Sequence, residues 1–356
     1  MPKNFVSLML LSFSLLLSAC GSSQSFTQEE KKFVHNLFLT QYLWYDQVAS
    51  NINYQSFTTP NALIDALRVN PPDRWSFSLT SEEYDNFVNQ KTEGFGFGFT
   101  PEFNIFLVRI GSPAYGKLFR GDKIISINGN LASTQALKSA KEKLGTPTTF
   151  TVLRNGQEEE VNITPNAYTF HVAQGKVIQQ DNKNIGYLRY DSFTSTSVNE
   201  LEQAFTQFKQ ANISDLIIDL RYNGGGSIAV ASTLLDNISN THAGERQGYL
   251  DWNANYKHKN ANFYFSDEVE PNDLNMKRVI FLVTKNSASA SELVISALKP
   301  YLGVNNVITI GTQTHGKNVG VSGMVYGNNY YVIINFYVRN NAGETTSSHG
   351  IAPTCS

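Results

Sequence analysis

The chain has 356 residues, of which 41% are hydrophobic and 12% aromatic, and its net charge is −2. This length suffices for two or three compact domains, and the composition supplies enough apolar side chains for their cores. Lysine and arginine are not in excess over the acidic residues, so nothing indicates a protein that neutralises phosphates, and nucleic acid is not an expected partner. Six scattered histidines and two cysteines argue against a structural metal site, and no cofactor is expected.

The first 20 residues have the pattern of a secretory signal peptide. Lys3 precedes an apolar run over residues 5–17, which is shorter than a membrane-spanning helix, and small residues follow it. Residues 17–20, Leu-Ser-Ala-Cys, resemble the bacterial lipoprotein box, which implies that Cys20 is lipidated. We therefore expect an exported protein that acyl chains anchor to the bacterial cell envelope, at the outer membrane or the periplasmic face. An ordinary signal peptide that contains a cysteine is the alternative.

The rest of the chain divides into three segments. Residues 21–91 combine a short tether with helical patterns, the first of which begins with a capping box at Thr27. Residues 92–166 alternate short strands with glycine turns, including an Asn-Gly hairpin signal at Asn155. Residues 167–356 alternate strands with helices, which favours a sheet of parallel strands. The predicted class is a multidomain α+β protein with a small helical N-terminal domain, a β domain and an α/β domain.

A serine-rich corner lies between the predicted strand 279–283 and the helix that follows it. Residues 286–292 read Asn-Ser-Ala-Ser-Ala-Ser-Glu. Ligands of α/β sheets bind beyond the carboxyl ends of the strands, and the unpaired N–H groups of a helix start favour a developing negative charge. A serine at this corner is therefore a candidate nucleophile, although the same residues also suit a plain helix N-cap.

Lys317 follows the next strand, at the end of Gly-Thr-Gln-Thr-His-Gly-Lys. Neighbouring parallel strands end at the same edge of a sheet, so this segment can face the serine corner. A serine hydroxyl needs a base to take its proton, and enzymes lower the pKa of a buried lysine to roughly 7–8 for this purpose. His315 is a rival base, and an ordinary surface lysine in a turn is the other alternative.

A glycine run, Asp219-Leu-Arg-Tyr-Asn-Gly-Gly-Gly-Ser227, follows the buried strand 216–220. Such a turn can direct backbone N–H groups at a reacting carbonyl, and each donor of this kind is typically worth about 2.7–4 kcal/mol. A plain strand-to-helix turn is the alternative. A phosphate-binding loop is disfavoured, because no Gly-Lys-Ser/Thr follows the glycines.

These three segments, in this order, resemble the carboxy-terminal processing, or tail-specific, serine peptidases, in their PDZ-containing bacterial lipoprotein branch. The resemblance extends to GSPAYGKLFRGDKIISING at 111–129, to YLWYD at 42–46 and to DRWSFSLTSEEY at 73–84. It implies a PDZ-like domain over 92–166 and a crotonase-like catalytic domain over 167–356.

The resemblance implies a role for each matching residue of the catalytic domain. Ser289, the middle serine of the corner, would be the nucleophile, and Lys317 the general base. The backbone N–H groups of Gly224, Gly225 and Ala290 would hold the oxyanion.

The resemblance also implies a substrate site in the PDZ-like domain. Phe95, Gly96 and Phe97 would receive the C-terminal carboxylate of a protein or peptide that adds as a strand to a sheet edge. One departure concerns the residue that orients the lysine: many relatives carry a glutamine four residues after it, where this chain has Val321. Glu292 or a serine near position 347 is an alternative for that role.

The function expected is that of a serine endopeptidase of the cell envelope, which cleaves unfolded or C-terminally exposed protein segments through an acyl-enzyme. The alternatives are a catalytically weak or inactive lipoprotein of the same fold that binds peptides or other ligands, and a purely structural lipoprotein. The sequence makes no prediction of oligomeric state.

Overall fold

The computed structural model describes residues 26–268 and 270–355. The expected signal peptide, Cys20 and the start of the tether lie outside these residues. The described chain forms two compact units: residues 85–171 are one, and residues 26–84 together with 172–355 are the other. The helical N-terminal segment, expected as a domain of its own, thus groups with the α/β segment. No helix of the described residues is both long and apolar enough to cross a membrane.

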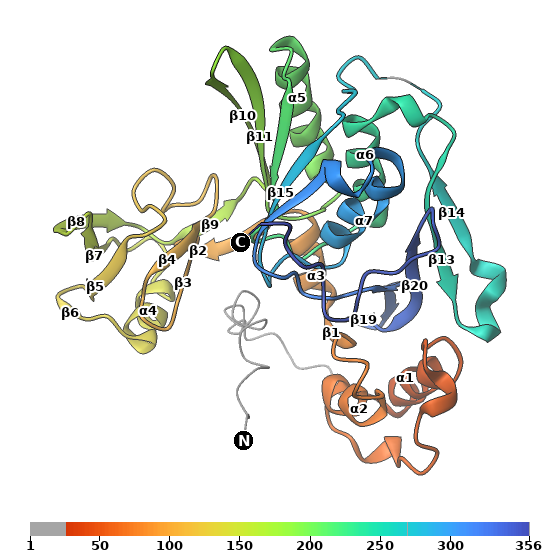
Figure 1. The fold of residues 1–356 in the computed structure, drawn as a ribbon. Helices are drawn as coiled ribbons and strands as arrows, with labels where there is room; N and C mark the ends of the chain where they lie inside the picture. Colours follow the sequence, from red (N-terminus) through yellow and green to blue (C-terminus); the bar gives the residue numbers. More distant parts are fainter. Residues whose placement is uncertain (1–25, 269, 356) are drawn as a thin grey trace. The chain divides into compact units, whose positions relative to one another are not determined.

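A five-stranded sheet forms the centre of the larger unit (Figure 1). Its order is β10 (Ala173–Gln180), β11 (Lys183–Tyr190), β12 (Asp215–Asp219), β15 (Val279–Val283) and β16 (Val307–Gly311). The pair β10–β11 is antiparallel, and β11, β12, β15 and β16 are parallel. The parallel strands predicted from the alternating pattern are therefore confirmed.

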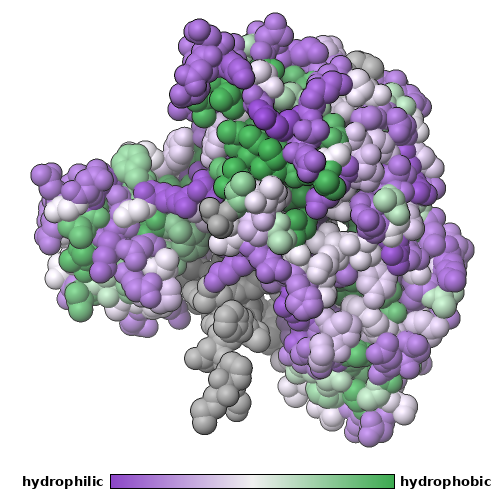
Figure 2. All heavy atoms as spheres, viewed as in Figure 1, coloured by the Kyte–Doolittle hydropathy of each residue, from purple (hydrophilic) through white to green (hydrophobic). Residues whose placement is uncertain are grey.

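The two faces of this sheet differ in burial. Helices α5 (Ser197–Gln210), α6 (Ile228–Ile238) and α7 (Ala290–Leu302) pack beside one another along one face. On that face Leu188, Ile218 and Phe281 are neighbours across the strands and are fully buried. Their counterparts on the opposite face, such as Ile217 and Ile280, are only half-buried, and Figure 2 shows apolar surface over these strands.

A second, antiparallel sheet packs against the other side of α7. Its order is β14 (Ala261–Tyr264), β13 (Arg246–Trp252), β20 (Ile334–Asn340) and β17 (Val319–Val321). Short 3-10 helices at 240–242, 254–259 and 304–306 connect these elements. Helix α7 is thus enclosed by both sheets, which holds its first residues in place.

The N-terminal segment comprises α1 (Gln28–Thr40), α2 (Pro60–Leu67), two 3-10 turns at 45–47 and 54–56, β1 (Phe77–Thr80) and α3 (Ser81–Val88). Strand β1 joins a small sheet with β19 (Asn329–Val332) and β18 (Met324–Tyr326). The segment and the C-terminal strands therefore share one core, formed by Val34, Leu37, Phe38, Tyr42, Trp44, Leu63, Ile64, Leu67, Trp75, Val319, Tyr331, Ile333 and Ile334. This shared burial is why the segment does not form a unit of its own.

The predicted capping box at Thr27 is only half formed. The Thr27 hydroxyl accepts from the Glu30 N–H at 3.2 Å, as predicted. The Glu30 carboxylate instead accepts from Tyr331 at 2.6 Å and from Asn329 at 2.8 Å. Contacts with distant strands outweigh the local cap here, because the Glu30 side chain is buried against them.

The smaller unit contains three short sheets and one helix. The sheets are β2 (Lys91–Gly94) with β9 (Asn166–Thr169), β3 (Phe97–Phe99) with β4 (Ile105–Val108), and β6 (Asn130–Leu131), β5 (Lys123–Ile127), β7 (Thr148–Arg154) and β8 (Gln157–Ile163) in that order. The helix is α4 (Thr134–Lys141). Asn155 and Gly156 both have positive φ and form the two-residue turn between β7 and β8 that the Asn-Gly signal predicted.

Candidate active site

The serine corner separates Ser289 from its two neighbours. Ser287 and Ser291 are fully buried. Their hydroxyls donate to the carbonyl oxygens of Leu220 at 2.7 Å and Asn223 at 2.9 Å. Ser289 is half-buried at the N-cap of α7, where its φ of 56° is unusual for a residue with a Cβ. The flanking serines therefore attach the corner to the glycine turn, and Ser289 lies at its strained apex.

The glycine turn contacts this apex directly. Gly225 has a φ of 104°, and a Cβ on it would lie 2.7 Å from the Ser289 Cβ and 3.0 Å from the Ala290 nitrogen. Its N–H donates to Asn223 Oδ1 at 2.9 Å, so the turn itself uses this expected oxyanion donor. The Gly224 N–H has no acceptor among the described residues. The Ala290 N–H lies at the first position of α7, where a helix N–H has no intrahelical acceptor. The N–H groups of Gly224 and Ala290 are thus the expected oxyanion donors that no acceptor among the described residues occupies.

A network of polar side chains holds the strand that leads into the glycine turn. Arg221 Nε donates to Asp219 Oδ1 at 2.8 Å, and the Tyr187 hydroxyl donates to Asp219 Oδ2 at 2.6 Å. Burial alone would raise the pKa of Asp219, but the hydrogen bonds from Arg221 and Tyr187 outweigh it and the pKa is lowered. Asp219 is therefore a buried anion that is paired and fully hydrogen-bonded, which keeps the end of β12 rigid.

Glu292 connects the serine corner to the segment of the lysine. Its side chain is fully buried. Oε2 accepts from the backbone N–H of Ser289 and from that of Lys317, each at 2.9 Å. Oε1 accepts from the Gly316 N–H at 2.7 Å and from the Thr314 hydroxyl at 2.6 Å. One carboxylate thus positions the backbones of both expected catalytic residues.

Lys317 has the electrostatics that a general base needs. Its pKa is lowered, because burial disfavours the ammonium form, while the carboxylates of Asp73 and Glu292 oppose this shift. Its side-chain amine makes no hydrogen bond or ion pair with a described residue. The neutral amine is the form that can accept a serine proton.

His315, the rival base, makes contacts through its backbone and Nδ1, while its Nε2 is buried without a hydrogen-bond partner among the described residues. Its backbone N–H donates to the Ser287 carbonyl at 2.9 Å, and its Nδ1 lies 3.3 Å from the Lys285 carbonyl oxygen. Burial, together with the charges of Arg74 and Lys317, lowers its pKa.

Positions 321 and 347 were the other ones considered for a residue that orients the Lys317 amine. Val321 ends β17 and pairs with Ile334, so it contributes only an apolar side chain. Ser347 is exposed, and its hydroxyl accepts from the His349 N–H at 3.1 Å.

Asp73 was not predicted to be a site residue, and the only signal for it was its place in the DRW segment. Its side chain is fully buried, and its charge acts on the pKa of Lys317.

The expected carboxylate loop of the smaller unit is largely aromatic core. The rings of Phe95 and Phe97 lie 5.0 and 5.7 Å from that of Phe150. Gly96 has a φ of 87°, and a Cβ on it would lie 2.1 Å from the Ser112 Cβ. Strand β3 pairs only with β4 among the described strands, so its other edge is open.

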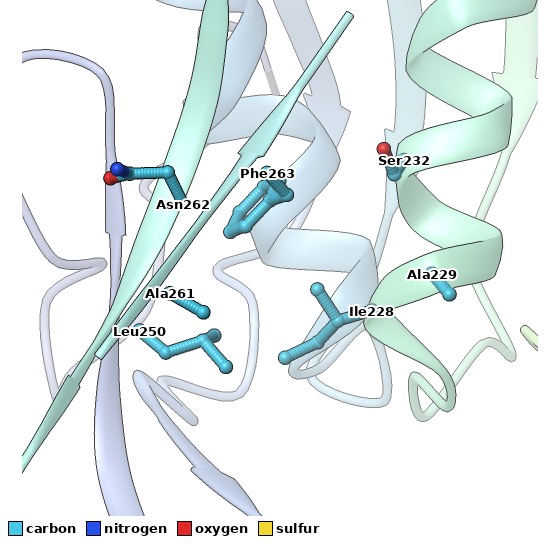
Figure 3. Close-up of a pocket in the computed structure, with 7 residues that line it drawn as sticks. All are labelled: Ile228, Ala229, Ser232, Leu250, Ala261, Asn262 and Phe263. Carbon is cyan, nitrogen blue, oxygen red and sulfur yellow. The ribbon is translucent and has the colours of Figure 1, made fainter. Parts of the chain in front are cut away.

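A pocket of about 330 Å³ lies between α6 and the β13–β14 hairpin (Figure 3). Ile228, at the start of α6, points toward Leu250 and Ala261, whereas Asn262 points away from the helix. Because Ile228 is three residues beyond Gly225, the pocket begins next to the glycine turn. Its lining is mostly apolar: Ile228, Ala229, Ser232, Leu250, Ala261, Asn262 and Phe263.

Two family models match the chain and define its class. A model described as Peptidase family S41 matches residues 184–356, and one described as Peptidase S41 N-terminal domain matches residues 29–77. The first range contains the serine corner, the glycine turn and the lysine segment. The chain belongs to peptidase family S41, the serine-type peptidases to which the carboxy-terminal processing enzymes belong.

Individual relatives agree with this assignment. A carboxy-terminal-processing protease of Bartonella bacilliformis is 27% identical over 336 residues, which cover 88% of this chain and 72% of the relative. A "Probable CtpA-like serine protease" of Staphylococcus saprophyticus is 28% identical over 207 residues, 56% of this chain and 38% of the relative. The chain thus spans well under half of that relative's length.

Two solved structures share the fold. A protein described as an S41 protease, from Bacteroides fragilis, has a TM-score of 0.76 at 22% identity, and the match covers 91% of this chain and 89% of that one. The photosystem II D1 C-terminal processing protease has a TM-score of 0.52 at 16% identity, with 92% and 93% covered. The mixed α+β fold is therefore that of an S41 protease with its N-terminal segment.

Proposed function

We propose that this chain is a serine endopeptidase in which Ser289 is the nucleophile and Lys317 the general base. The observation that carries the proposal is the Glu292 carboxylate, which binds the backbone N–H groups of both residues at 2.9 Å. The strained φ of Ser289 and the lowered pKa of Lys317 support the same assignment. His315 is the alternative base.

The reaction follows from these groups. The neutral Lys317 amine takes the Ser289 hydroxyl proton as the oxygen attacks the peptide carbonyl, and the N–H groups of Gly224 and Ala290 bind the oxyanion. The C–N bond then breaks, and the Lys317 ammonium gives its proton to the leaving amine. Water hydrolyses the resulting ester, with Lys317 as its base, and restores the free serine. Gly225 shapes the turn and is not a donor in this scheme.

Substrate recognition is the second part of the proposal. The smaller unit acts as a PDZ-like domain that receives the C-terminal segment of an unfolded or exposed protein chain at residues 95–97, along the open edge of β3. The catalytic part has a crotonase-like arrangement, and the pocket beside Ile228 accepts an apolar substrate side chain near the scissile bond.

The third part concerns location. The signal-like residues 1–20 and the Leu-Ser-Ala-Cys box support an exported lipoprotein of the cell envelope, anchored at Cys20. Expression of the full chain with labelled palmitate tests this. The label should be incorporated into the wild type and lost in Cys20→Ser, and equal labelling of both would contradict it.

The peptidase proposal is tested with purified protein and an unfolded protein substrate such as casein. We expect fragments from the wild type and none from Ser289→Ala, and a loss of about 10²–10⁴ in kcat/KM for Lys317→Ala. Equal fragment patterns from the wild type and Ser289→Ala, or none from either, would refute it and favour a ligand-binding protein of the same fold. Full activity of Lys317→Ala combined with loss in His315→Ala would instead make His315 the base.

A further inference from the structure

Asp73 is a buried carboxylate that the reaction above does not use. Its Oδ1 accepts from the Trp75 N–H at 2.8 Å and from the Ser76 N–H at 3.0 Å, which closes a local turn. Its Oδ2 has no donor within 3.5 Å among the described residues, although the side chain is fully buried. A buried carboxylate oxygen is costly unless a donor or a positive charge lies near it. This arrangement therefore points to a cationic partner.

The segment that carries Asp73 lies against the segment that carries Lys317. Arg74 Nη2 donates to the His315 carbonyl oxygen at 2.9 Å. Trp75 belongs to the same buried cluster as Val319. Arg74 thus binds the residue two positions before Lys317, and Trp75 shares a core with the residue two positions after it. The turn that Asp73 closes therefore lies against the segment that carries Lys317.

Electrostatics agree with this placement. Asp73 raises the pKa of Lys317 more than Glu292 does, although burial lowers it overall. On its other side Asp73 has Tyr42, whose hydroxyl accepts from the Val69 N–H at 3.0 Å. Burial, then the Asp73 charge and, as a lesser cause, a side-chain hydrogen bond with Asp73 raise the pKa of Tyr42, so the tyrosine stays neutral. Of the nearby cations, Arg68 pairs with Asp65 and Arg74 donates to the His315 carbonyl, so Lys317 is the cation that these contacts leave for Asp73.

We propose that Asp73 is a positioning residue for Lys317, supplied by the N-terminal segment. Its carboxylate orients the amine and stabilises the ammonium that forms when Lys317 takes the Ser289 proton. It would fill the orienting role that the resemblance assigns to a glutamine at the position where this chain has Val321. The inference rests on the proposed function, because the ammonium forms only if Lys317 is the base.

The variant that tests this is Asp73→Asn. It keeps Oδ1, and with it the turn, but removes the charge that faces Lys317. Asp65→Asn is the matched control, since Asp65 lies in the same segment but is 62% exposed and pairs with Arg68. If Asp73→Asn fails to fold, Asp73→Ser replaces it, because a serine hydroxyl can also accept the turn N–H groups.

Kinetics give the first readout. For Asp73→Asn we expect the plateau of kcat/KM to fall by about tenfold or more, mainly in kcat, because base catalysis contributes about 10²–10⁴ and loses its orientation. The acid limb of the pH profile should move to lower pH, because the lost carboxylate no longer favours the ammonium. A merely structural role would leave the position of that limb unchanged. Asp65→Asn should match the wild type in both respects.

Nuclear magnetic resonance gives a second readout that does not need activity. The Cε signal of Lys317, in protein labelled with [¹³Cε]lysine and assigned by its loss in Lys317→Arg, should titrate at lower pH in Asp73→Asn than in the wild type. An identical titration in both would overturn the inference. A shifted titration with unchanged kcat would overturn the positioning role. If the wild type shows no peptidase activity at all, the kinetic arm fails with the proposed function, whereas this titration still decides whether Asp73 and Lys317 interact.

Discussion

Replacing Gly225 by alanine should misplace Ser289, and replacing its neighbour Gly224 should not. A Cβ on Gly225 would lie 2.7 Å from the Ser289 Cβ and 2.8 Å from the Ala288 oxygen, whereas ordinary contacts begin at 3.4 Å. Relief of the first contact alone requires a shift of about 0.7 Å (3.4 minus 2.7), and a misplacement of about 1 Å typically costs about 100-fold in rate. We therefore expect Gly225→Ala to lose about 10- to 100-fold in kcat/KM. Its positive φ adds a strain of about 1–2 kcal/mol.

Gly224 provides the control within the same turn. A Cβ there meets no atom within 4 Å, and alanine keeps the N–H that we assign to the oxyanion site. Gly224→Ala should keep its activity within about twofold and its free energy of unfolding within about 1 kcal/mol, since Gly-to-Ala changes at unstrained sites are neutral or stabilising. The assays are steady-state cleavage of a peptide substrate and urea unfolding. Equal activity of the two variants would refute the contact between the turn and Ser289.

Three other predictions concern Glu292, the pocket and the pH dependence of stability. Glu292→Gln should lower the free energy of unfolding by about 2–4 kcal/mol and abolish most activity. The reason is that an amide cannot accept from all four donors that the carboxylate binds. Wild-type stability of this variant in urea would contradict the prediction. Ala261→Phe should fill the pocket and raise KM by about tenfold for substrates with a large apolar side chain near the scissile bond, but not for those with alanine there; equal effects on both substrates would remove the pocket from recognition. Burial raises the pKa of Asp236 to about 6, so the folded state holds this proton more tightly than the unfolded state, and stability falls as pH rises from about 4 to about 6. Relative to Asp236→Asn, the wild type should lose about 1–2 kcal/mol of unfolding free energy between pH 4 and pH 7, after allowance for solvent screening; a parallel pH dependence of the two proteins would contradict this.

Local patterns were enough to predict much of the catalytic part. Short apolar runs alternating with helical spacing predicted the parallel strands β11, β12, β15 and β16, and the Asn-Gly pair predicted the turn between β7 and β8. These features depend on residues close together in the chain, so periodicity and turn chemistry show them. The meeting of the serine corner with the lysine segment followed from the same strand order.

Long-range contacts lay beyond such reasoning. Nothing local shows that Glu30 bonds to Tyr331, so the N-terminal segment was expected as a separate domain. From the sequence, only the resemblance favoured Ser289 over Ser287 as the nucleophile. The structure adds a physical reason, because the buried Ser287 hydroxyl donates to the Leu220 carbonyl oxygen. The burial of Asp73 against the lysine segment likewise depends on two parts of the chain that sequence spacing does not relate.

Trapping an acyl-enzyme on Ser289 would test most directly whether this residue is the nucleophile. The full chain would be mixed with a p-nitrophenyl ester of a short acylated peptide, quenched in acid, and weighed intact by mass spectrometry. Trypsin would then release the peptide between Lys285 and Lys317, and fragmentation would locate the added acyl group. We expect a mass increase equal to one acyl group, placed on Ser289 and absent from Ser289→Ala. Acylation of Ser287 or Ser291, or equal acylation of Ser289→Ala, would contradict it.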